Sequence, residues 1–550
     1  MFSAADAREY LSKHGVEEKL AQAIRQVAKE RPVDPVAAIG KFLVGASAAP
    51  DTLSCVTWNI AAVNNNPFEY WMTHPDVDYG KLMEDVQNFI EAPGELDCAV
   101  SAVFTPQMFD ELNALMDAQG WDAGEAASAA FADMSSRSII SGFLKDAELG
   151  SKRLMSMPDR MTNTIDLADG GTVYRPTVIS CYDGDMSSTA AWWQQWKDFH
   201  FANPLLLPGK KGAPASSKLP CALLDKISRS KYPALSEEEE AMSVRLQTIC
   251  LAIFDAILVH MLNTLSPGGK WIELKRSIIK ATLHQKEAKT AAVLVDTYGD
   301  ADVIFLQEVR TKMAVAKALE ATHYCFKPTP SSKADQNSII LLSRARFDES
   351  AVEDVTKAAI AHLPGEGGAK IADGDLLVIK ATDRRGGHFL LASFHGDTDG
   401  LMTAPTLAAV HAYAASLGPA WPLVFGLDAN TYFKPVKPGK QAAVVDFLKD
   451  VYAKGLAASC GESADLPTSF SARTFLQPQL QKACKTNEKK TKGDYNPKDY
   501  ILYTPGAMSV TATGLDNSGK RSYDAELVLP TLDWPSDHSL MHAQFTLSPG

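Results

Sequence analysis

The sequence predicts an α/β sandwich, with β-sheets inside and helices outside, in the second half of the chain. Residues 300–309, "DADVIFLQEV", form a continuous apolar run that is typical of a strand buried on both faces. Similar short runs recur towards the C-terminus, and a helical segment at 403–418 separates two of them. Strands that are joined partly through helices place those helices outside the sheets.

Residues 5–45 are predicted to form two helices outside this sandwich. The apolar positions of the first helix recur at helical spacing, at Leu20, Ala23, Ile24 and Val27. The sequence "ERPVDP" separates the two helices, because Asp34 suits an N-cap and Pro35 suits the first helical position. Two short helices cannot bury their apolar faces alone, so either self-association or packing against the same chain must cover them.

This N-terminal pattern resembles the Dpy-type docking-and-dimerisation motif, which is related to that of kinase A regulatory subunits. The resemblance covers roughly the first 45 residues and rests mainly on the "ERPVDP" hinge and the "FL" that ends the second helix. It implies a homodimeric four-helix bundle whose groove accepts an amphipathic helix from a protein partner. We therefore expect residues 1–48 to form a helical docking and dimerisation module. Such modules hold proteins in ciliary, chromatin or other scaffold assemblies.

The predicted strands begin directly after this module, with "DTLSCVTWNIAAV" at 51–63. The other predicted strands are 300–309, 338–347, 375–383, 387–396, 421–430, 498–505 and 539–547. Residues 72–294 differ in character, since they are helix-rich and contain the linker-like "LPGKKGAPASSKLP" at 207–220. We expect 50–71 and 295–550 to form one domain, with 72–294 inserted into it.

The composition excludes several classes of protein. A hydrophobic content of 46% is typical of globular proteins with real cores. The formal net charge of -12 argues against a broad, sequence-independent nucleic-acid surface, although a local basic groove stays compatible with it. The eight cysteines are scattered without a CxxC motif, which indicates reduced thiols and no zinc site.

We expect a cytoplasmic protein, for two reasons. The N-terminus lacks the basic-then-apolar order of a signal peptide. The long apolar segment "LQTICLAIFDAILVHMLNTL" carries Asp255 and His260, so we expect a buried helix rather than a membrane span.

Polar residues occupy the ends of the predicted strands, where a sheet presents side chains to a ligand. These residues are Asn59, Glu308, His395, Asp428, Asn430, Asp499, Asp537 and His538. Each one alone is typical of an ordinary strand end or turn. Their recurrence at matching strand ends is harder to explain by folding, so together they predict a functional site.

The motifs "WNI", "LQEV", "GLDAN", "KDYIL" and "PSDH" resemble, in order, the signature of the endonuclease/exonuclease/phosphatase superfamily. That group includes pancreatic-type deoxyribonuclease, apurinic endonucleases, inositol polyphosphate 5-phosphatases, neutral sphingomyelinases and poly(A)-specific deadenylases. The resemblance covers about 50–71 and 295–547. It implies a metal-dependent phosphoric ester hydrolase. The expected fold is a four-layer α/β sandwich with two central β-sheets, plus the N-terminal two-helix module and the helix-rich insertion.

The resemblance and the chemistry of phosphate esters together imply the metal ligands. Hydrolysis of a phosphate ester needs charge neutralisation on the phosphate oxygens, an activated water and in-line geometry. Glu308 and Asn59 are expected to be the main ligands of a Mg²⁺ ion, and Asp537 to complete the metal shell. Mn²⁺ is the alternative metal.

The remaining residues are implied to act on the water and the phosphate. Asp428 is expected to orient or deprotonate the attacking water, and Asn430 to hold the phosphate or nucleophile in line. His538 would contact the scissile phosphate, with Asp499 fixing its tautomer and favouring its charged form. His395 either assists the leaving group as an acid or is a turn residue in "FHGDTDG".

Two features depart from the pattern of the superfamily. Its Asn and Glu motifs usually lie a few tens of residues apart, whereas here an insertion of roughly two hundred residues, far longer than an ordinary connection, follows Asn59 at the mouth of the site. We expect this insertion to be a lid or a substrate-selecting subdomain. Its aromatic runs at 68–71 and 191–202 are interpreted as core rather than as stacking surfaces for a base or sugar. Leu427 precedes Asp428 where the family often has Gly, but the spacing to Asn430 is kept.

Residues 469–502 form the one clearly basic region of the chain and lead straight into Asp499. This region is either a solvated loop or a flexible cationic flap over a phosphorylated substrate. In the second interpretation Arg473 and Lys498 bind the substrate.

The sequence thus predicts a Mg²⁺-dependent phosphoesterase that acts on a soluble phosphorylated metabolite, nucleotide or inositol phosphate. An endo- or exonuclease or deadenylase of the same fold, acting on RNA or DNA, is the alternative, and the acidic balance weighs against it. An inactive scaffold that works through its N-terminal module is a third hypothesis. It is disfavoured because folding does not require acids clustered at one sheet edge.

Overall fold

The computed structural model describes residues 16–31, 34–40, 51–61, 64–209, 213–310, 314–328, 336–363, 371–437, 439–462 and 464–548. Within the N-terminal module it contains helix α2 (Val16–Glu30) and a further helical turn at 35–40. The first part of the predicted helical pair and the end of its second helix lie outside the described residues.

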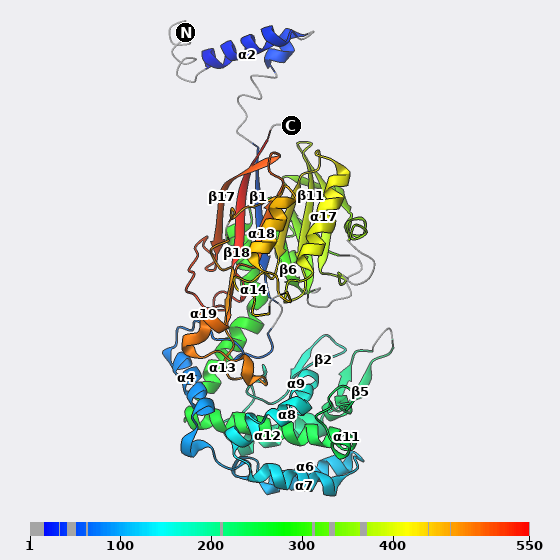
Figure 1. Cartoon of the computed structure of the whole chain (residues 1–550), viewed down its shortest axis with the longest axis vertical. Coiled ribbons are helices and arrows are strands. Elements are labelled where there is room, and N and C mark those ends of the chain that lie inside the picture. The colour runs from blue at the N-terminus through cyan, green and yellow to red at the C-terminus, as the bar shows by residue number, and fades with distance from the viewer. Residues whose placement is uncertain are drawn as a thin grey trace.

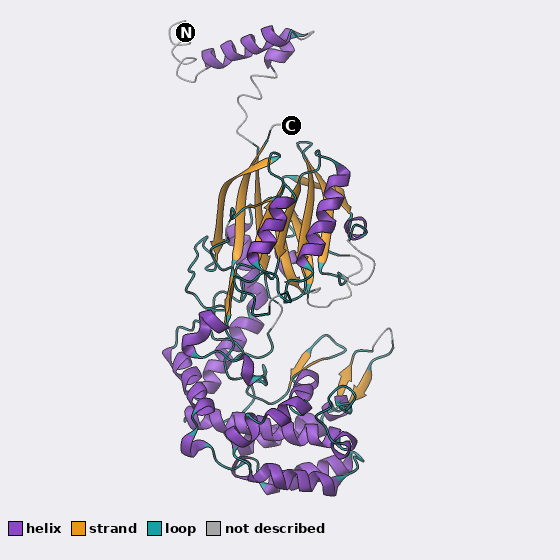
Figure 2. Cartoon of the chain, in the orientation of Figure 1, coloured by secondary structure: helices purple, strands orange, loops and turns teal. Residues whose placement is uncertain are grey.

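Two six-stranded sheets form the centre of the protein (Figure 2). In sheet order, the first contains β17 (Met508–Asp516), β18 (Leu540–Leu547), β1 (Thr52–Asn59), β6 (Val303–Val309), β8 (Asn337–Ser343) and β7 (His323–Phe326). In the same way, the second contains β13 (Ala457–Ala458), β16 (Asp499–Tyr503), β12 (Leu423–Asp428), β11 (His388–His395), β10 (Leu376–Asp383) and β9 (Phe347–Asp354). Each strand predicted from the sequence therefore has a counterpart.

The strands that the sequence did not predict lie mostly at the sheet edges. β9 reads "FDESAVED" and β17 reads "MSVTATGLD", and most of their side chains are exposed or half-buried. An edge strand with few buried side chains lacks the apolar run that identifies a central strand.

Apolar side chains fill the space between the two sheets, and helices cover both outer faces. Leu53, Val303 and Phe305 of the first sheet pack against Ile379 and Leu391 of the second. Helices α16 (Thr356–Ile360), α17 (Thr403–Leu417) and α18 (Val444–Ala453) cover the second sheet, and α14 (Lys286–Ala292), η7 (Val293–Thr297) and α15 (Val315–Ala318) cover the first. The predicted four-layer α/β sandwich is confirmed.

Gly426 on β12 lets the two sheets approach closely below the strand ends. A Cβ atom at this position would lie 2.4 Å from the side chain of Phe305 on the facing β6. Any larger residue would therefore push the sheets apart near the predicted site.

The segment between β1 and β6 forms a large helical body beyond the end of the sandwich opposite to the C-terminus (Figure 1). Its helices are α4 (Val77–Glu91), α5 (Val100–Val103), α6 (Pro106–Ala118), α7 (Gly124–Ser136), α8 (Ala147–Lys152), α9 (Ser156–Thr162), α10 (Thr189–Lys197), α11 (Glu237–Ala241), α12 (Ser243–Leu265) and α13 (Lys270–Ile279). Two small hairpins, β2–β3 (Thr164–Asp166 and Thr172–Tyr174) and β4–β5 (Leu205–Leu207 and Ser216–Lys218), project from it. At its end, α14 and η7 already pack against the first sheet.

Helix α12 is the centre of this body. By length and composition it could cross a membrane, but 78% of its most apolar window is buried inside the protein. Its Asp255 is fully buried and accepts hydrogen bonds from Arg175, Thr177 and Trp196. The aromatic run of α10 is also core, since Trp192, Trp193 and Trp196 are buried against α12. These features are those of a core helix, as the sequence predicts.

The basic region is anchored to the helical body instead of forming a free flap. It consists of β14 (Ser469–Ser471), η8 (Leu480–Lys482), η9 (Thr486–Glu488), α19 (Lys489–Lys492) and β15 (Asp494–Asn496). Leu476 and Cys484 are buried in the same apolar core as α12. The Trp71 indole donates a hydrogen bond to the Cys484 carbonyl at 3.0 Å. Lys482, Lys490 and Lys492 of this region are exposed, while its apolar residues hold the backbone in place.

Candidate active site

The predicted site residues meet at one end of the sandwich because of the strand register. Within the second sheet, His395 pairs with Asp428 across β11 and β12, and Asp428 pairs with Asp499 across β12 and β16. In the first sheet, β1 and β6 run parallel, so Asn59 and Glu308 end at the same edge. Because the two sheets pack face to face, the residues of the first sheet meet those of the second at this end.

A cavity of about 1460 Å³ opens over these strand ends. The predicted residues that line it are Glu308, His395, Asp428, Asn430, Arg473, Lys498, Asp537 and His538. Asn59 and Asp499 are fully buried behind this wall. The first eight line the cavity, whereas the last two lie behind them.

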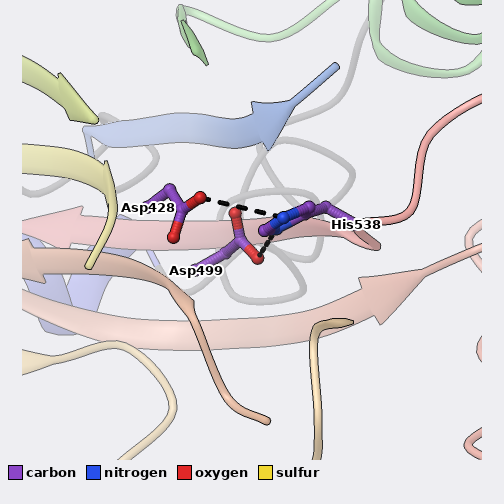
Figure 3. Close-up of side chains that lie close together, drawn as sticks. All are labelled: Asp428, Asp499 and His538. Atoms are coloured by element: carbon purple, nitrogen blue, oxygen red, sulfur yellow. Dashed lines mark hydrogen bonds and ion pairs between the residues drawn. The ribbon is translucent and has the colours of Figure 1, made fainter. Parts of the chain in front are cut away.

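His538 is held by hydrogen bonds on its ring and its backbone. Its Nδ1 lies 2.8 Å from Asp499 Oδ2, and its Nε2 lies 3.8 Å from Asp428 Oδ2 (Figure 3). Two indoles, those of Trp58 and Trp534, donate to its carbonyl oxygen at 3.1 and 2.8 Å. Because Asp499 occupies Nδ1, the ring nitrogen that is left for a ligand is Nε2, which lies on the side of Asp428.

The carboxylates around His538 favour its charged form. Burial alone would lower the pKa of His538, but Asp499 and Asp428 raise this pKa well above its usual value. The pKa of Asp428 is lowered, because His538 and His395 outweigh the opposing effect of its burial. The surroundings of His538 therefore favour a protonated imidazole ring beside an ionised Asp428.

Asn59 contacts two carboxylates through its amide nitrogen. Its Nδ2 donates to Glu308 Oε1 at 3.0 Å and to Asp428 Oδ2 at 2.8 Å. Its Oδ1 accepts a hydrogen bond from the backbone N–H of Ala61 at 2.9 Å. Asn59 therefore links Glu308 to Asp428, and its role as a metal ligand stays a prediction.

Lys498 supplies a buried cation to the cavity floor. Its Nζ donates to Asn430 Oδ1 at 3.0 Å and forms an ion pair with Asp494 at 2.6 Å. Burial opposes its charge, but Asp494 and Asp428 raise the pKa of Lys498, so the amine stays protonated. Asn430 is thereby oriented by a fixed charge, as is suitable for a residue that contacts an anion.

His395 belongs to the site. Its Nε2 lies 3.5 Å from Glu308 Oε1 and 3.6 Å from Asp428 Oδ2. The alternative, a local turn residue in "FHGDTDG", does not fit the structure, because His395 is the last residue of strand β11 and lines the main cavity.

The donor set fits a hard divalent cation. Glu308 and Asp537 line both the main cavity and an adjoining cavity of about 280 Å³. Carboxylate oxygens are the ligands that Mg²⁺ and Mn²⁺ prefer. Asp428, Asp499 and His538 also bring potential ligand atoms within 4.8 Å of one another. Asp499 already occupies His538 Nδ1, so these two residues are better explained as a carboxylate–imidazole pair that holds a proton than as metal ligands.

Several residues that support the site were missed from the sequence. Thr468 donates a hydrogen bond to Asp499 Oδ2 at 2.6 Å. Ser536 donates to the Asn59 carbonyl at 2.7 Å and accepts from the backbone N–H of His538 at 3.0 Å. Lys286, on α14, donates to the Pro535 carbonyl and lines the smaller cavity with Asp537. Only Ser536 carried a signal, because it lies within the "PSDH" motif.

Comparisons with known families agree with these observations. Residues 276–538 match the profile described as "Endonuclease/Exonuclease/phosphatase family", and residues 6–48 match the "Dpy-30 motif". Residues 97–276 match a domain of unknown function, DUF8234, which covers most of the helical body. The two predicted resemblances are confirmed. A search of curated proteins gives no match.

The search of solved structures gives distant similarities. TDP2 of D. rerio, complexed with single strand DNA product, is 14% identical, with a TM-score of 0.30 over 47% of this chain and 91% of that one. ANGEL2, a 2′,3′-cyclic phosphatase, is 13% identical, with a TM-score of 0.33 over 49% and 87%. The human Nocturnin catalytic domain is 16% identical, with a TM-score of 0.31 over 48% and 87%. At these TM-scores we draw no functional conclusion from the similarities.

Proposed function

We propose that this protein is a metal-dependent phosphoric ester hydrolase that acts on a soluble phosphorylated small molecule with Mg²⁺. The match of residues 276–538 to the endonuclease/exonuclease/phosphatase family supports this proposal. The supporting observation is the charged His538 between Asp499 and Asp428, beside the cation of Lys498, at the floor of one cavity. Nothing about folding requires this concentration of charge, so it supports catalysis on an anion.

Glu308 and Asp537 would hold the metal, which supplies charge neutralisation on the phosphate oxygens when bound. Asp428, held ionised by its neighbours, accepts a hydrogen bond from the attacking water and orients it. Asn430, fixed by Lys498, holds a phosphate oxygen in line.

Two histidines remain for the proton steps. His538 Nε2 donates a hydrogen bond to a phosphate oxygen as negative charge develops. His395 lies beside Glu308 and Asp428, where it can give a proton to the leaving oxygen.

A nuclease of the same fold is the second candidate. One wall of the main cavity carries Lys434, Lys482, Lys490 and Lys492, which are exposed cations. Such a wall suits a phosphate backbone, although the net charge of -12 weighs against broad nucleic-acid binding.

A panel of phosphomonoesters, phosphodiesters and oligonucleotides with Mg²⁺ tests both candidates. We expect hydrolysis of a small phosphate ester, with loss of activity in EDTA and a loss of roughly a hundredfold or more in His538→Ala. His542→Ala is a matched control four residues further along the chain, in β18, because His542 does not line these two cavities. Activity that survives both EDTA and His538→Ala would show that the site is assigned wrongly. Salt-sensitive oligonucleotide binding would favour the nuclease.

We also propose that residues 1–48 form a homodimer that offers a groove to an amphipathic helix, in a cytoplasmic enzyme held on a scaffold. The Dpy-30 match supports docking or dimerisation. On α2, Leu20 and Ile24 are 40% and 50% exposed, so the described residues leave part of its apolar face uncovered.

A further inference from the structure

A separate cavity, of about 420 Å³, lies in the helical body at the base of the two hairpins β2–β3 and β4–β5, which project from that body (Figure 1). We call it the hairpin cavity. The end of β3, the segment after it, the end of α10 with η3 (Asp198–Ala202), and the start of β4 form its walls. It shares no lining residue with the two cavities at the strand ends. Its volume is in the range of cavities that bind small molecules.

Three aromatic rings line the hairpin cavity: those of Tyr174 at the end of β3, of Tyr182, and of Phe199 on η3. All three residues are half-buried. Tyr174 and Phe199 belong to none of the apolar cores that the described residues form. Their chain neighbours Trp196 and Phe201, in contrast, are buried in the core around α12. These two rings therefore line the cavity instead of packing in the core.

Two carboxylates, those of Asp183 and Asp198, line the same cavity, whereas no Lys, Arg or His does so among the described residues. Neither carboxylate forms an ion pair with another described residue. Burial raises the pKa of Tyr182, and Asp183, Asp185 and Asp198 raise it further. The cavity thus has a negative potential, which suits a cation.

The cations near the cavity bind backbone carbonyls instead of these carboxylates. Arg276 donates to the carbonyl of Asp183 at 3.1 Å. The buried Lys275 donates to the carbonyls of Thr177 and Tyr182 at 2.8 and 2.7 Å. Both carboxylates of the cavity therefore stay available to a charged ligand.

We propose that the hairpin cavity binds a quaternary ammonium group, carried by a small molecule or by a methylated lysine side chain. Such a group has no N–H to leave unpaired, and the faces of Tyr and Phe rings attract its charge. Asp183 and Asp198 add charge complementarity, and the apolar wall at Val173, Pro176 and Leu205 fits the methyl groups. The site is distinct from the catalytic cavity, and the inference does not depend on the proposed hydrolysis.

Calorimetric titration of the full chain with matched ligands tests the site without any substitution. Choline is compared with ethanolamine, which has the charge without the methyl groups, and with its neutral carbon analogue, in which a tert-butyl group replaces trimethylammonium. A short peptide with trimethyl-lysine is compared with the same peptide carrying unmodified lysine. We expect choline or the trimethyl-lysine peptide to bind with a Kd of about a millimolar or lower, at least about tenfold more tightly than its counterparts. The tighter of the two identifies the carrier of the ammonium group.

Two double substitutions test the residues that recognise the ligand. Tyr174→Leu/Phe199→Leu removes two rings but keeps apolar side chains, and we expect binding to weaken at least about tenfold. Asp183→Asn/Asp198→Asn should weaken it to a similar degree, because the charge of the ligand loses its partners.

The matched controls are Tyr324→Leu, at a half-buried aromatic residue of β7, and Asp225→Asn, at an exposed carboxylate of the helical body. Neither residue lines the hairpin cavity, so both variants should bind as the natural protein does.

The ligand series alone can overturn the proposal. Equal affinity for choline and its neutral analogue, equal affinity for methylated and unmethylated ligands, or no binding at millimolar concentration would each do so. An unchanged Kd in both double variants, with thermal unfolding that shows them folded, would also overturn it. None of these outcomes depends on hydrolysis, so they are independent of the proposed function.

Discussion

Glu308 and Asn430 hold backbone conformations that are uncommon for residues other than glycine. Their φ angles are 54° and 47°, in the left-handed region. Each lies at or just after the end of a central strand, and each side chain lines the main cavity. Such a conformation costs on the order of 1–3 kcal/mol and persists where the surroundings impose it. The fold thus accepts two destabilising backbone conformations, which direct both side chains into the main cavity.

Lys498 gives a prediction at the same scale. Lys498→Met removes the cation that orients Asn430 and leaves the half-buried Asp494 without its ion pair. We expect kcat/KM to fall about a hundredfold, the typical effect of losing a charged group that stabilises the transition state. Lys498→Arg should recover only part of it, because the fork of Arg differs from a point charge. Lys440→Met, an exposed lysine, is the control. Unchanged kcat/KM in Lys498→Met would remove this residue from the site.

Helix α13 fixes an irregular part of the helical body through one buried amine. Lys275 Nζ donates to the carbonyls of Thr177 and Tyr182 at 2.8 and 2.7 Å. These bonds secure the chain between β3 and α10, which has no regular structure of its own. Burial lowers the pKa of Lys275 to about 7, although Cys181, Asp183 and Asp255 act in the opposite direction.

The lowered pKa of Lys275 predicts a pH-dependent stability. Between pH 7 and 10.5, the unfolded chain binds the lysine proton more tightly than the folded chain does, so the free energy of unfolding rises with pH in that window. We expect a contribution of up to about 1.4 kcal/mol per pH unit, measured by urea unfolding at several pH values as the difference between the natural protein and Lys275→Met. Lys280→Met, an exposed neighbour, should show no such difference. Parallel pH curves for the natural protein and Lys275→Met would contradict the assignment.

At the scale of the whole molecule, the basic segment joins the helical body to the β-sandwich. The basic segment runs out of the sandwich, buries Phe475 and Leu476 in the core of the helical body, and returns to the site at Lys498. A shared apolar core resists separation, so of the two roles expected for the insertion we favour a fixed wall of the main cavity over a loose lid.

The N-terminal helices give a prediction for the assembly. We expect the full chain to have twice the mass of one chain in light scattering after size exclusion, and a protein lacking residues 1–48 to have the mass of one. Leu20→Glu/Ile24→Glu should also give the single mass, because it places charges on the uncovered face of α2. Lys19→Glu, an exposed change on the same helix, is the control. An unchanged mass after deletion would exclude this route to a dimer, and the hydrolytic rate should stay the same throughout.

By itself the sequence determined the central strands and the residues at their ends, because a buried strand carries its apolar run and its polar ending in a few consecutive positions. Asn59, Glu308, Asp428, Asp499 and His538 could be picked out in this way. Only the tertiary structure decided which atoms of these residues meet, such as the amide nitrogen of Asn59 between two carboxylates.

The same holds for the residues that shape the cavities. Trp71 anchors the basic segment across 413 positions of sequence, and Lys286 reaches the "PSDH" loop across 249. Contacts of this kind depend on how separate elements pack, so they leave no local pattern in the sequence. Strands and their ends, in contrast, are determined by a few consecutive residues.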